Sequence, residues 1–214
     1  MNEKYLMLDT ETANTIDDPF FYDLGCAVID EDGTIYETAS FVNADIFLDK
    51  EMMATAYFAD KIPQYWDDIK SGKRVLKSHY NIRKAVRDLI KKWDIHFVVA
   101  HNARFDYRST NYTQRLVTSS KYRYFFPYGV KFIDTLEMAR VTLRWNRDYI
   151  NFCLNYDYLC KNGTPRFTAE IIYRWLTNNA GFVESHTGLE DVLIEAAIFT
   201  YCRKVNPTVD GLLW

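Results

Sequence analysis

Four acidic residues and one histidine, spread along the chain, could together form a metal site. Asp9 and Glu11 follow one short apolar run, Asp106 follows another, and His186 and Asp191 lie just before a third. An ionised carboxylate beside apolar surface is costly unless a charge compensates it. Magnesium and manganese, which prefer oxygen ligands, commonly supply that charge. If the three segments meet in space, we expect a metal-dependent enzyme.

Asp9 and Glu11 lie two residues apart, at the end of a strand predicted over residues 4–9. Side chains two apart in a strand point to the same face, so the two carboxylates are expected to be neighbours and Thr10 to point the other way. We place them at the carboxyl end of the strand, where active sites of sheet proteins form. A pair of solvated acids at a strand end is the alternative.

Asp106 comes after the apolar run 95–100, near the start of a helix predicted from about Arg104. If the strands 4–9 and 95–100 are adjacent and parallel, Asp106 reaches the acids of the first strand. Asn102 could hydrogen-bond one of these acids and orient it. A carboxylate in this place could instead cap the helix or interact with its dipole.

His186 and Asp191 are five residues apart, which is about 140° around a helix, so they cannot share a helical face. The sequence Thr187-x-x-Glu190 has the form of a capping box. We therefore predict that Thr187 is the N-cap, that Asp191 lies in the first turn and that His186 precedes the helix on a loop. A surface or purely structural histidine is the alternative.

The remaining pattern predicts an α/β fold in one domain, residues 1–214. Residues 4–9, 23–30 and 34–43 are expected to form an antiparallel meander, with Glu31-Asp32-Gly33 as a turn. Further strands are predicted at 95–100 and 130–133, which gives a mixed five-stranded sheet. Expected helices are 50–59, 63–71, 81–93, one from about 104, 134–145, 149–160, 168–178 and 187–204.

Composition favours a globular protein of the cytoplasm. The chain has 214 residues, 48% of them hydrophobic, yet no apolar stretch approaches the roughly 20 residues that cross a membrane. The first residues lack the pattern of a signal peptide. Cys26, Cys153, Cys160 and Cys202 show no zinc-ligand spacing, so we expect reduced thiols, mostly buried.

Charge is unevenly distributed along the chain. Residues 1–69 contain 3 basic and 16 acidic residues, residues 70–92 contain 9 and 1, and residues 101–131 contain 6 and 1. A basic middle in an acidic chain indicates a surface for a polyanion, although a solvated helix face is an equal alternative. The 16 tyrosines, 14 phenylalanines and 5 tryptophans mostly indicate core packing, and some could stack on bases.

Five segments in order resemble the DEDD superfamily of 3′–5′ exonucleases, in its histidine-bearing branch. Residues 8–12, 101–106 and 186–191 are similar to its three motifs, and residues 23–29 and 133–140 to two further segments. Gly188 and Val192 stand where the family often has alanines, which leaves local packing open. Residues 50–79 are not accounted for by the resemblance.

The resemblance implies a ribonuclease H-like fold and a metal-dependent 3′–5′ exonuclease. Asp9, Glu11, Asp106 and Asp191 would hold two Mg²⁺ or Mn²⁺ ions, and His186 would act as general base. The expected product is nucleoside monophosphate and the expected substrate single-stranded DNA, with RNA as the alternative. A polymerase partner and a homodimer stay open, as does a role in DNA replication.

Residues beside the motif positions are the expected contacts of the terminal nucleotide; they are Thr10 through its backbone, Glu11, Thr12, Asn102, Phe105 and His186. Simple core packing is the alternative for Phe105. Basic residues including Arg83, Lys84, Arg87, Arg104 and Arg108 could follow the phosphate backbone. A non-catalytic nucleic-acid-binding module and a purely structural protein are the competing hypotheses.

Overall fold

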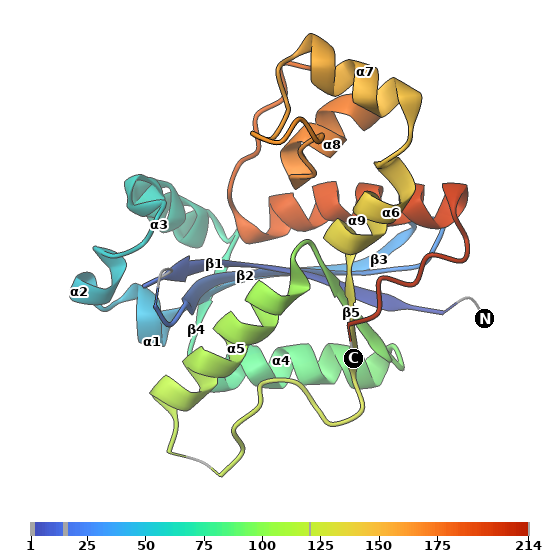
Figure 1. Ribbon diagram of the computed structural model, residues 1–214. Coiled ribbons are helices and arrows are strands. Elements are labelled where there is room, and N and C mark those ends of the chain that lie inside the picture. Colours follow the sequence, from blue (N-terminus) through green and yellow to red (C-terminus); the bar gives the residue numbers. More distant parts are fainter. Residues whose placement is uncertain (1–2, 15–16, 120, 214) are drawn as a thin grey trace.

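The computed structural model describes residues 3–14, 17–119 and 121–213 (Figure 1). Its strands are β1 (Tyr5–Ala13), β2 (Phe20–Ile29), β3 (Ile35–Asn43), β4 (Val75–Lys77), β5 (Phe97–Ala100) and β6 (Lys131–Asp134). They form one mixed sheet in the order β4-β3-β2-β1-β5-β6. The β1–β2 and β2–β3 pairs are antiparallel, whereas β1–β5, β5–β6 and β3–β4 are parallel.

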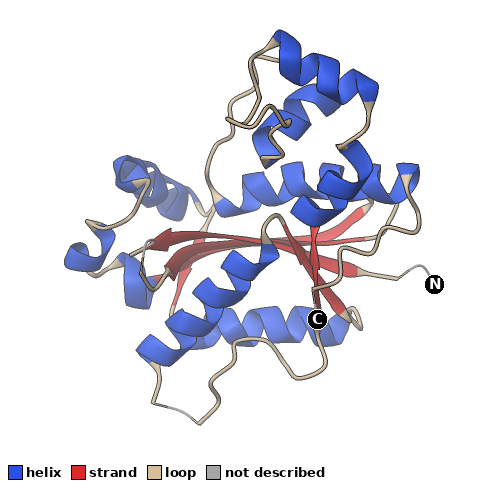
Figure 2. Cartoon of the chain, viewed as in Figure 1, coloured by secondary structure: helices blue, strands red, loops and turns tan. Residues whose placement is uncertain are grey.

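Helices cover both faces of the sheet (Figure 2). They are α1 (Ala44–Phe47), α2 (Lys50–Met53), α3 (Ile62–Ser71), α4 (His79–Lys92), α5 (Ala103–Val117), α6 (Thr135–Leu143), α7 (Arg147–Asn155), α8 (Ala169–Leu176) and α9 (Gly188–Val205), with a 3₁₀ turn at Ala59–Lys61.

Alternation along β1 separates the two cores. Tyr5 and Met7 pack with α6 to α9, whereas Leu6 and Leu8 pack with α4 and α5. Successive side chains of a strand point to opposite faces, so Asp9 and Glu11 continue the row on the α9 side. The predicted α/β fold and the predicted parity are confirmed.

The sheet has six strands among the described residues, so the predicted count of five is wrong. The additional strand, β4, pairs in parallel with the end of β3 through Phe41–Val75, Val42–Leu76 and Asn43–Lys77. Three residues are too few to show a period of two, and Val75 is exposed. The strand belongs to the stretch 50–79 that the resemblance does not explain.

β1 is longer than predicted, because it runs on to Ala13 and stays paired with β2. Asp9 and Glu11 therefore lie inside the strand and not at its carboxyl end. Its pairing with β5 nevertheless stops at Met7–Val99. The acids consequently lie beside the carboxyl end of β5, where the chain turns into α5.

Two predicted helices are shorter in the structure. The predicted helix 50–59 is the single turn α2 followed by a 3₁₀ turn, and the predicted helix 149–160 ends at Asn155. Asp157 has a φ of 57°, in the left-handed region, which a right-handed helix cannot accommodate. The other helices match their predicted ranges to within a few residues.

Three of the four cysteines, Cys26, Cys153 and Cys202, are buried, and all four are free thiols. No helix among the described residues is long and apolar enough to cross a membrane.

Candidate active site

A cavity of about 1210 Å³ opens where the three motif segments meet. Asp9 and Glu11 reach it from β1, Asp106 from the first turn of α5, and His186 and Asp191 from the start of α9. The far side is formed by α6 and by the segment 160–169. The five residues selected from the sequence therefore line one cavity, although they span almost the whole chain.

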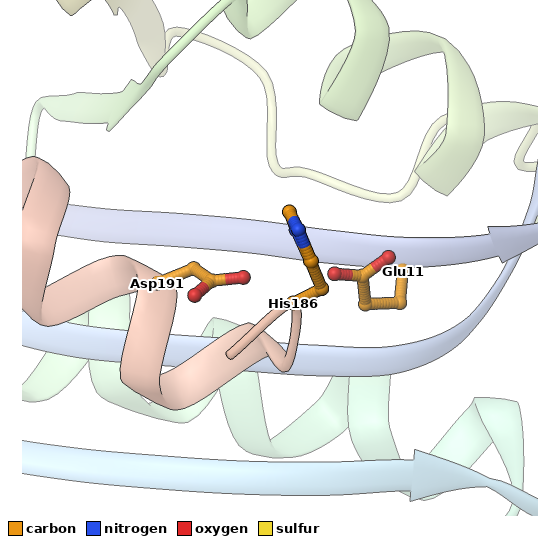
Figure 3. Close-up of side chains that lie close together, drawn as sticks. All are labelled: Glu11, His186 and Asp191. Atoms are coloured by element: carbon orange, nitrogen blue, oxygen red, sulfur yellow. The ribbon is translucent and has the colours of Figure 1, made fainter. Parts of the chain in front are cut away.

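Glu11, His186 and Asp191 lie close together in this cavity (Figure 3). One ligand atom from each residue lies within 4.8 Å of the others. The carboxylate oxygens of Glu11 and Asp191 at this spacing suit a divalent metal, and the imidazole lies beside them. Asp9 and Asp106 line the same cavity.

Thr10 orients Asp106 from the opposite face of β1. Its backbone N–H and its hydroxyl both donate to Asp106 Oδ1, at 3.0 and 2.8 Å. The predicted role of Asn102 is therefore filled by Thr10. Asn102 instead adopts a left-handed conformation, with a φ of 67°, and its backbone N–H donates to Asp134 Oδ1 at 2.9 Å.

Burial raises the pKa of every carboxyl of the predicted set. The pKa of Glu11 rises to about 9 and that of Asp191 to about 8, because neighbouring carboxylates add to the effect of burial. The pKa of Asp106 rises to about 7, since the Thr10 hydrogen bonds partly offset its burial. The pKa of Asp9 is also raised, by burial and then by Glu195.

These shifts describe a site in which acidic side chains outnumber basic ones, with Arg140 and Arg144 as the basic residues of its lining. Lys61 is the basic side chain that lowers the pKa of Glu11, and it acts against burial and several acids. Divalent cations favour such oxygen-rich, electronegative cavities, and bound ions would restore ordinary ionisation to the carboxyls. The residues present thus fit Mg²⁺ or Mn²⁺.

Three further acids line the cavity that the sequence did not single out: Glu137, Glu184 and Glu195. Glu195 is 4% exposed and lies one turn after Asp191 on α9, so both lie on the same face of the helix and line the cavity. Its Oε2 accepts the backbone N–H of His101 at 3.1 Å. The four-residue spacing from Asp191 was the available signal. Glu184, whose pKa burial raises to about 7, lies on a loop with no such signal.

Thr187 is the N-cap of α9, as predicted, but the capping box is not formed as expected. The Thr187 backbone N–H donates to Asp191 Oδ2 at 2.9 Å, and its hydroxyl donates to Glu190 Oε2 at 2.9 Å. Glu190 stays bonded to the N-cap hydroxyl and also binds Arg74 and Lys73, at 2.7 and 2.6 Å, while Asp191 accepts the N-cap backbone N–H. Asp191 is consequently fixed by the cap itself.

His186 precedes α9 on a loop, as predicted, but neighbours on a distant segment hold it in place. Its ring stacks on Phe58 with centroids 4.3 Å apart and planes 13° apart. Lys61 donates to the carbonyl of Ser185, the preceding residue. A φ of 49° aims the side chain into the cavity. These contacts give the 3₁₀ turn at Ala59–Lys61 and its flank a role in the site.

A buried ion network ties the start of α9 to β2. Asp23 Oδ2 accepts the backbone N–H of Gly188 at 2.9 Å, the Tyr65 hydroxyl at 2.8 Å and Arg74 Nη1 at 3.2 Å. Arg74, which is 1% exposed, also binds Glu190 on α9. Tyr65 and Arg74 both come from the unassigned stretch 50–79, which therefore supports the site.

Gly188 and Gly25 let the backbones of α9 and β2 touch. A Cβ on Gly188 would lie 2.6 Å from the nitrogen of Gly25, and one on Gly25 would lie 2.1 Å from the carbonyl carbon of Gly188. Gly25 is the cross-strand partner of Asp9. The glycine at 188 is thus required by this close approach.

Most of the predicted nucleotide contacts line the cavity: Thr10, Glu11, Asn102, Phe105 and His186. Thr12 does not line it and is buried, 5% exposed, beyond a bulge that follows Glu11. His101 is held by the Phe167 carbonyl on Nε2 and by Thr135 Oγ1 on Nδ1. Burial lowers its pKa to about 4, so it is a neutral structural residue.

No protein-family model and no curated protein matches the chain. Several solved structures match it. Exonuclease X in complex with 5′-overhanging duplex DNA aligns with a TM-score of 0.53 at 14% identity, over 96% of this chain and 95% of that one. E. coli exonuclease I in complex with a dA16 oligonucleotide aligns with a TM-score of 0.59 at 15% sequence identity, over 96% of this chain and 42% of that one.

Exonuclease I from Methylocaldum szegediense gives a TM-score of 0.60 at 16% identity, over 96% of this chain and 41% of that one. The chain therefore spans about two fifths of these exonuclease I chains and nearly all of exonuclease X. Sequence identities this low support a shared fold and no more. The chain has the ribonuclease H-like fold of exonuclease I and exonuclease X.

Proposed function

We propose that the chain is a metal-dependent 3′–5′ exonuclease that releases nucleoside monophosphates. The observation that carries the proposal is the convergence of Asp9, Glu11, Asp106, Asp191 and His186 on one cavity. The shared fold of exonucleases I and X supports it. The five side chains come from three segments that are far apart in the sequence, β1, the start of α5 and the start of α9.

Asp9, Glu11, Asp106 and Asp191 would hold the divalent ions, with Glu195 beside them. Bound Mg²⁺ or Mn²⁺ supplies a nucleophile at neutral pH by lowering the pKa of water, and neutralises charge on the phosphate. The chain's own part is to fix these carboxylates. The Thr10 hydrogen bonds fix Asp106 and the Thr187 N–H fixes Asp191.

His186 is the proposed general base. Burial and then Lys61 lower the pKa of its imidazole, which keeps the ring neutral at pH 7 and able to accept a proton. The stack on Phe58 keeps the ring at the cavity wall beside Glu11 and Asp191. A neutral, held imidazole is suited to take the proton from attacking water.

Single-stranded DNA is the proposed substrate, and RNA the alternative. Exonuclease I is described with a dA16 oligonucleotide and exonuclease X with 5′-overhanging duplex DNA. In this chain Phe105 and Asn102 line the cavity beside Asp106, in position to contact a terminal nucleotide. A single domain, a cytoplasmic location, a polymerase partner and a homodimer stay predictions.

The test is digestion of a 5′-labelled oligonucleotide by wild type, Asp9→Asn and the exposed control Asp148→Asn. We expect wild type and the control to shorten the labelled oligonucleotide stepwise in Mg²⁺ and to be inactive in EDTA. We expect Asp9→Asn to be inactive in both. Trimming by Asp9→Asn at the wild-type rate, or none by wild type, contradicts the proposal. DNA binding without any product would favour a non-catalytic module.

A further inference from the structure

A row of basic and aromatic side chains leads away from the cavity along α5. Arg104, Arg108, Tyr112 and Arg115 fall within about 80° of the helix circumference, at 100° per residue. The three arginines are exposed and Tyr112 is half-buried. Arg104 adjoins Phe105, which lines the cavity. The row thus starts at the mouth of the cavity and extends about 16 Å from it, at 1.5 Å per residue.

The loop that follows α5 continues the row. Tyr122 and Tyr124 are 63% and 57% exposed. The Arg115 guanidinium lies 6.0 Å from the Tyr124 ring. Arg83 of α4 anchors this loop, because it donates to the carbonyls of Tyr124 and Phe125, each at 3.0 Å. We call the combined area the α5 surface; it comprises Arg108, Tyr112, Arg115, Tyr122, Arg123 and Tyr124.

The chemistry of the α5 surface fits a flexible polyanion that carries flat rings. Arg108 and Arg115 lie 5.6 and 5.8 Å from the Tyr112 ring. A guanidinium above a ring keeps its edge available for bidentate contact with a phosphate. From Arg104 to Lys131 the chain has six basic residues and one acid, and that acid, Asp106, is buried in the cavity.

We propose that the α5 surface binds the single-stranded nucleic acid upstream of the 3′ end. The arginines would contact successive phosphates and the exposed tyrosines would stack on bases. This inference rests on the proposed exonuclease function and adds a second binding area outside the cavity. It also gives the basic residues between positions 101 and 131 a partner, the nucleic-acid strand.

The test compares the double variant Arg108→Gln/Arg115→Gln with the control Arg147→Gln/Lys204→Gln. The control removes the same charge from exposed positions on α7 and at the end of α9. Fluorescence anisotropy in EDTA measures binding of labelled single strands of about four and about 16 nucleotides, the range of single-strand site sizes.

We expect the double variant to bind the longer strand about tenfold more weakly, with a salt slope reduced by about 1.4, or about 0.7 for each lost phosphate contact. The short strand should bind equally to all three proteins, because it reaches only the cavity. Unchanged binding of the longer strand, or an equal loss in the control, overturns the proposal.

Mg²⁺-dependent trimming by the same wild-type preparation separates the two proposals. If wild type trims but the double variant binds the longer strand normally, only the α5 surface is refuted. If wild type does not trim, the proposed function itself fails. A membrane role would give a different result. If wild type binds phosphatidylserine vesicles, and the double variant loses this binding but keeps its oligonucleotide affinity, the α5 surface binds a membrane and the inference is overturned.

Discussion

The contact between Gly188 and Gly25 gives a prediction whose size follows from the structure. In Gly188→Ala the new Cβ would lie 2.6 Å from the Gly25 nitrogen and 3.2 Å from its Cα. Relief to an ordinary contact of about 3.5 Å requires α9 and β2 to separate by about 1 Å. Such overpacking costs about 1–3 kcal/mol, against a gain of about 0.4–1 kcal/mol from restricting the unfolded chain.

We therefore expect Gly188→Ala to be destabilised by about 1–2 kcal/mol, which lowers Tm by about 2–8 °C in a chain of this size. Gly188 lies between His186 and Asp191, so a shift of about 1 Å should also slow trimming by about 10²-fold. Thermal unfolding and the oligonucleotide assay measure the two effects.

The matched control is Gly181→Ala. Its new Cβ would meet only Asn179 Oδ1, at 3.7 Å, an ordinary contact. This variant should unfold at or slightly above the wild-type temperature and trim normally. If Gly188→Ala were as stable and as active as Gly181→Ala, the close approach of α9 to β2 would be refuted.

Three further predictions concern the cavity. Phe58→Ala should lower kcat by about tenfold with little change in KM, because His186 loses its stacking partner and with it part of the rate gain of a general base. The variant Tyr57→Ala, at the exposed neighbouring residue, should keep the wild-type kcat. Equal kcat values for the two variants would contradict a positioning role of Phe58. Glu195→Gln should weaken Mn²⁺ binding by about tenfold in calorimetry, since it removes a buried charge but keeps an acceptor for its hydrogen bond; wild-type affinity would exclude Glu195 from the site. In EDTA, Tm should fall from about pH 5 to about pH 9. The pKa of Glu11 is raised to about 9 in the fold, so its protonated carboxyl favours the folded state at low pH, and this stabilisation is lost as pH rises through about 9. Added Mg²⁺ should flatten this decline, and a rise of Tm with pH in EDTA would refute the assignment.

The sequence allowed the fold class and the acids that line the cavity to be predicted because both depend on local periodicity and motif order. A period of two placed Asp9 and Glu11 on one face, and the spacing before α9 put His186 outside the helix and Asp191 inside it. The same rule could have identified Glu195, one turn after Asp191. The predicted end of β1 was wrong because β2 continues the pairing to Ala13.

Other parts of the site depend on contacts that no local pattern reveals. Phe58 and His186 are separated by 128 positions, and Arg74 and Glu190 by 116. β4 has three residues, too few for a period. Glu190 had the spacing of a capping box, but it shares its carboxylate between the Thr187 hydroxyl and Arg74, which comes from a distant segment. Tertiary contacts therefore override the local signal where the site is assembled.

The most direct test of the central claim, that these acids form a metal site, is anomalous diffraction from a crystal of the wild-type chain soaked in Mn²⁺. We expect anomalous density in the cavity between Glu11, Asp191 and Asp9, and its loss in Asp9→Asn. Density elsewhere on the molecule, with none in this cavity, would contradict the account.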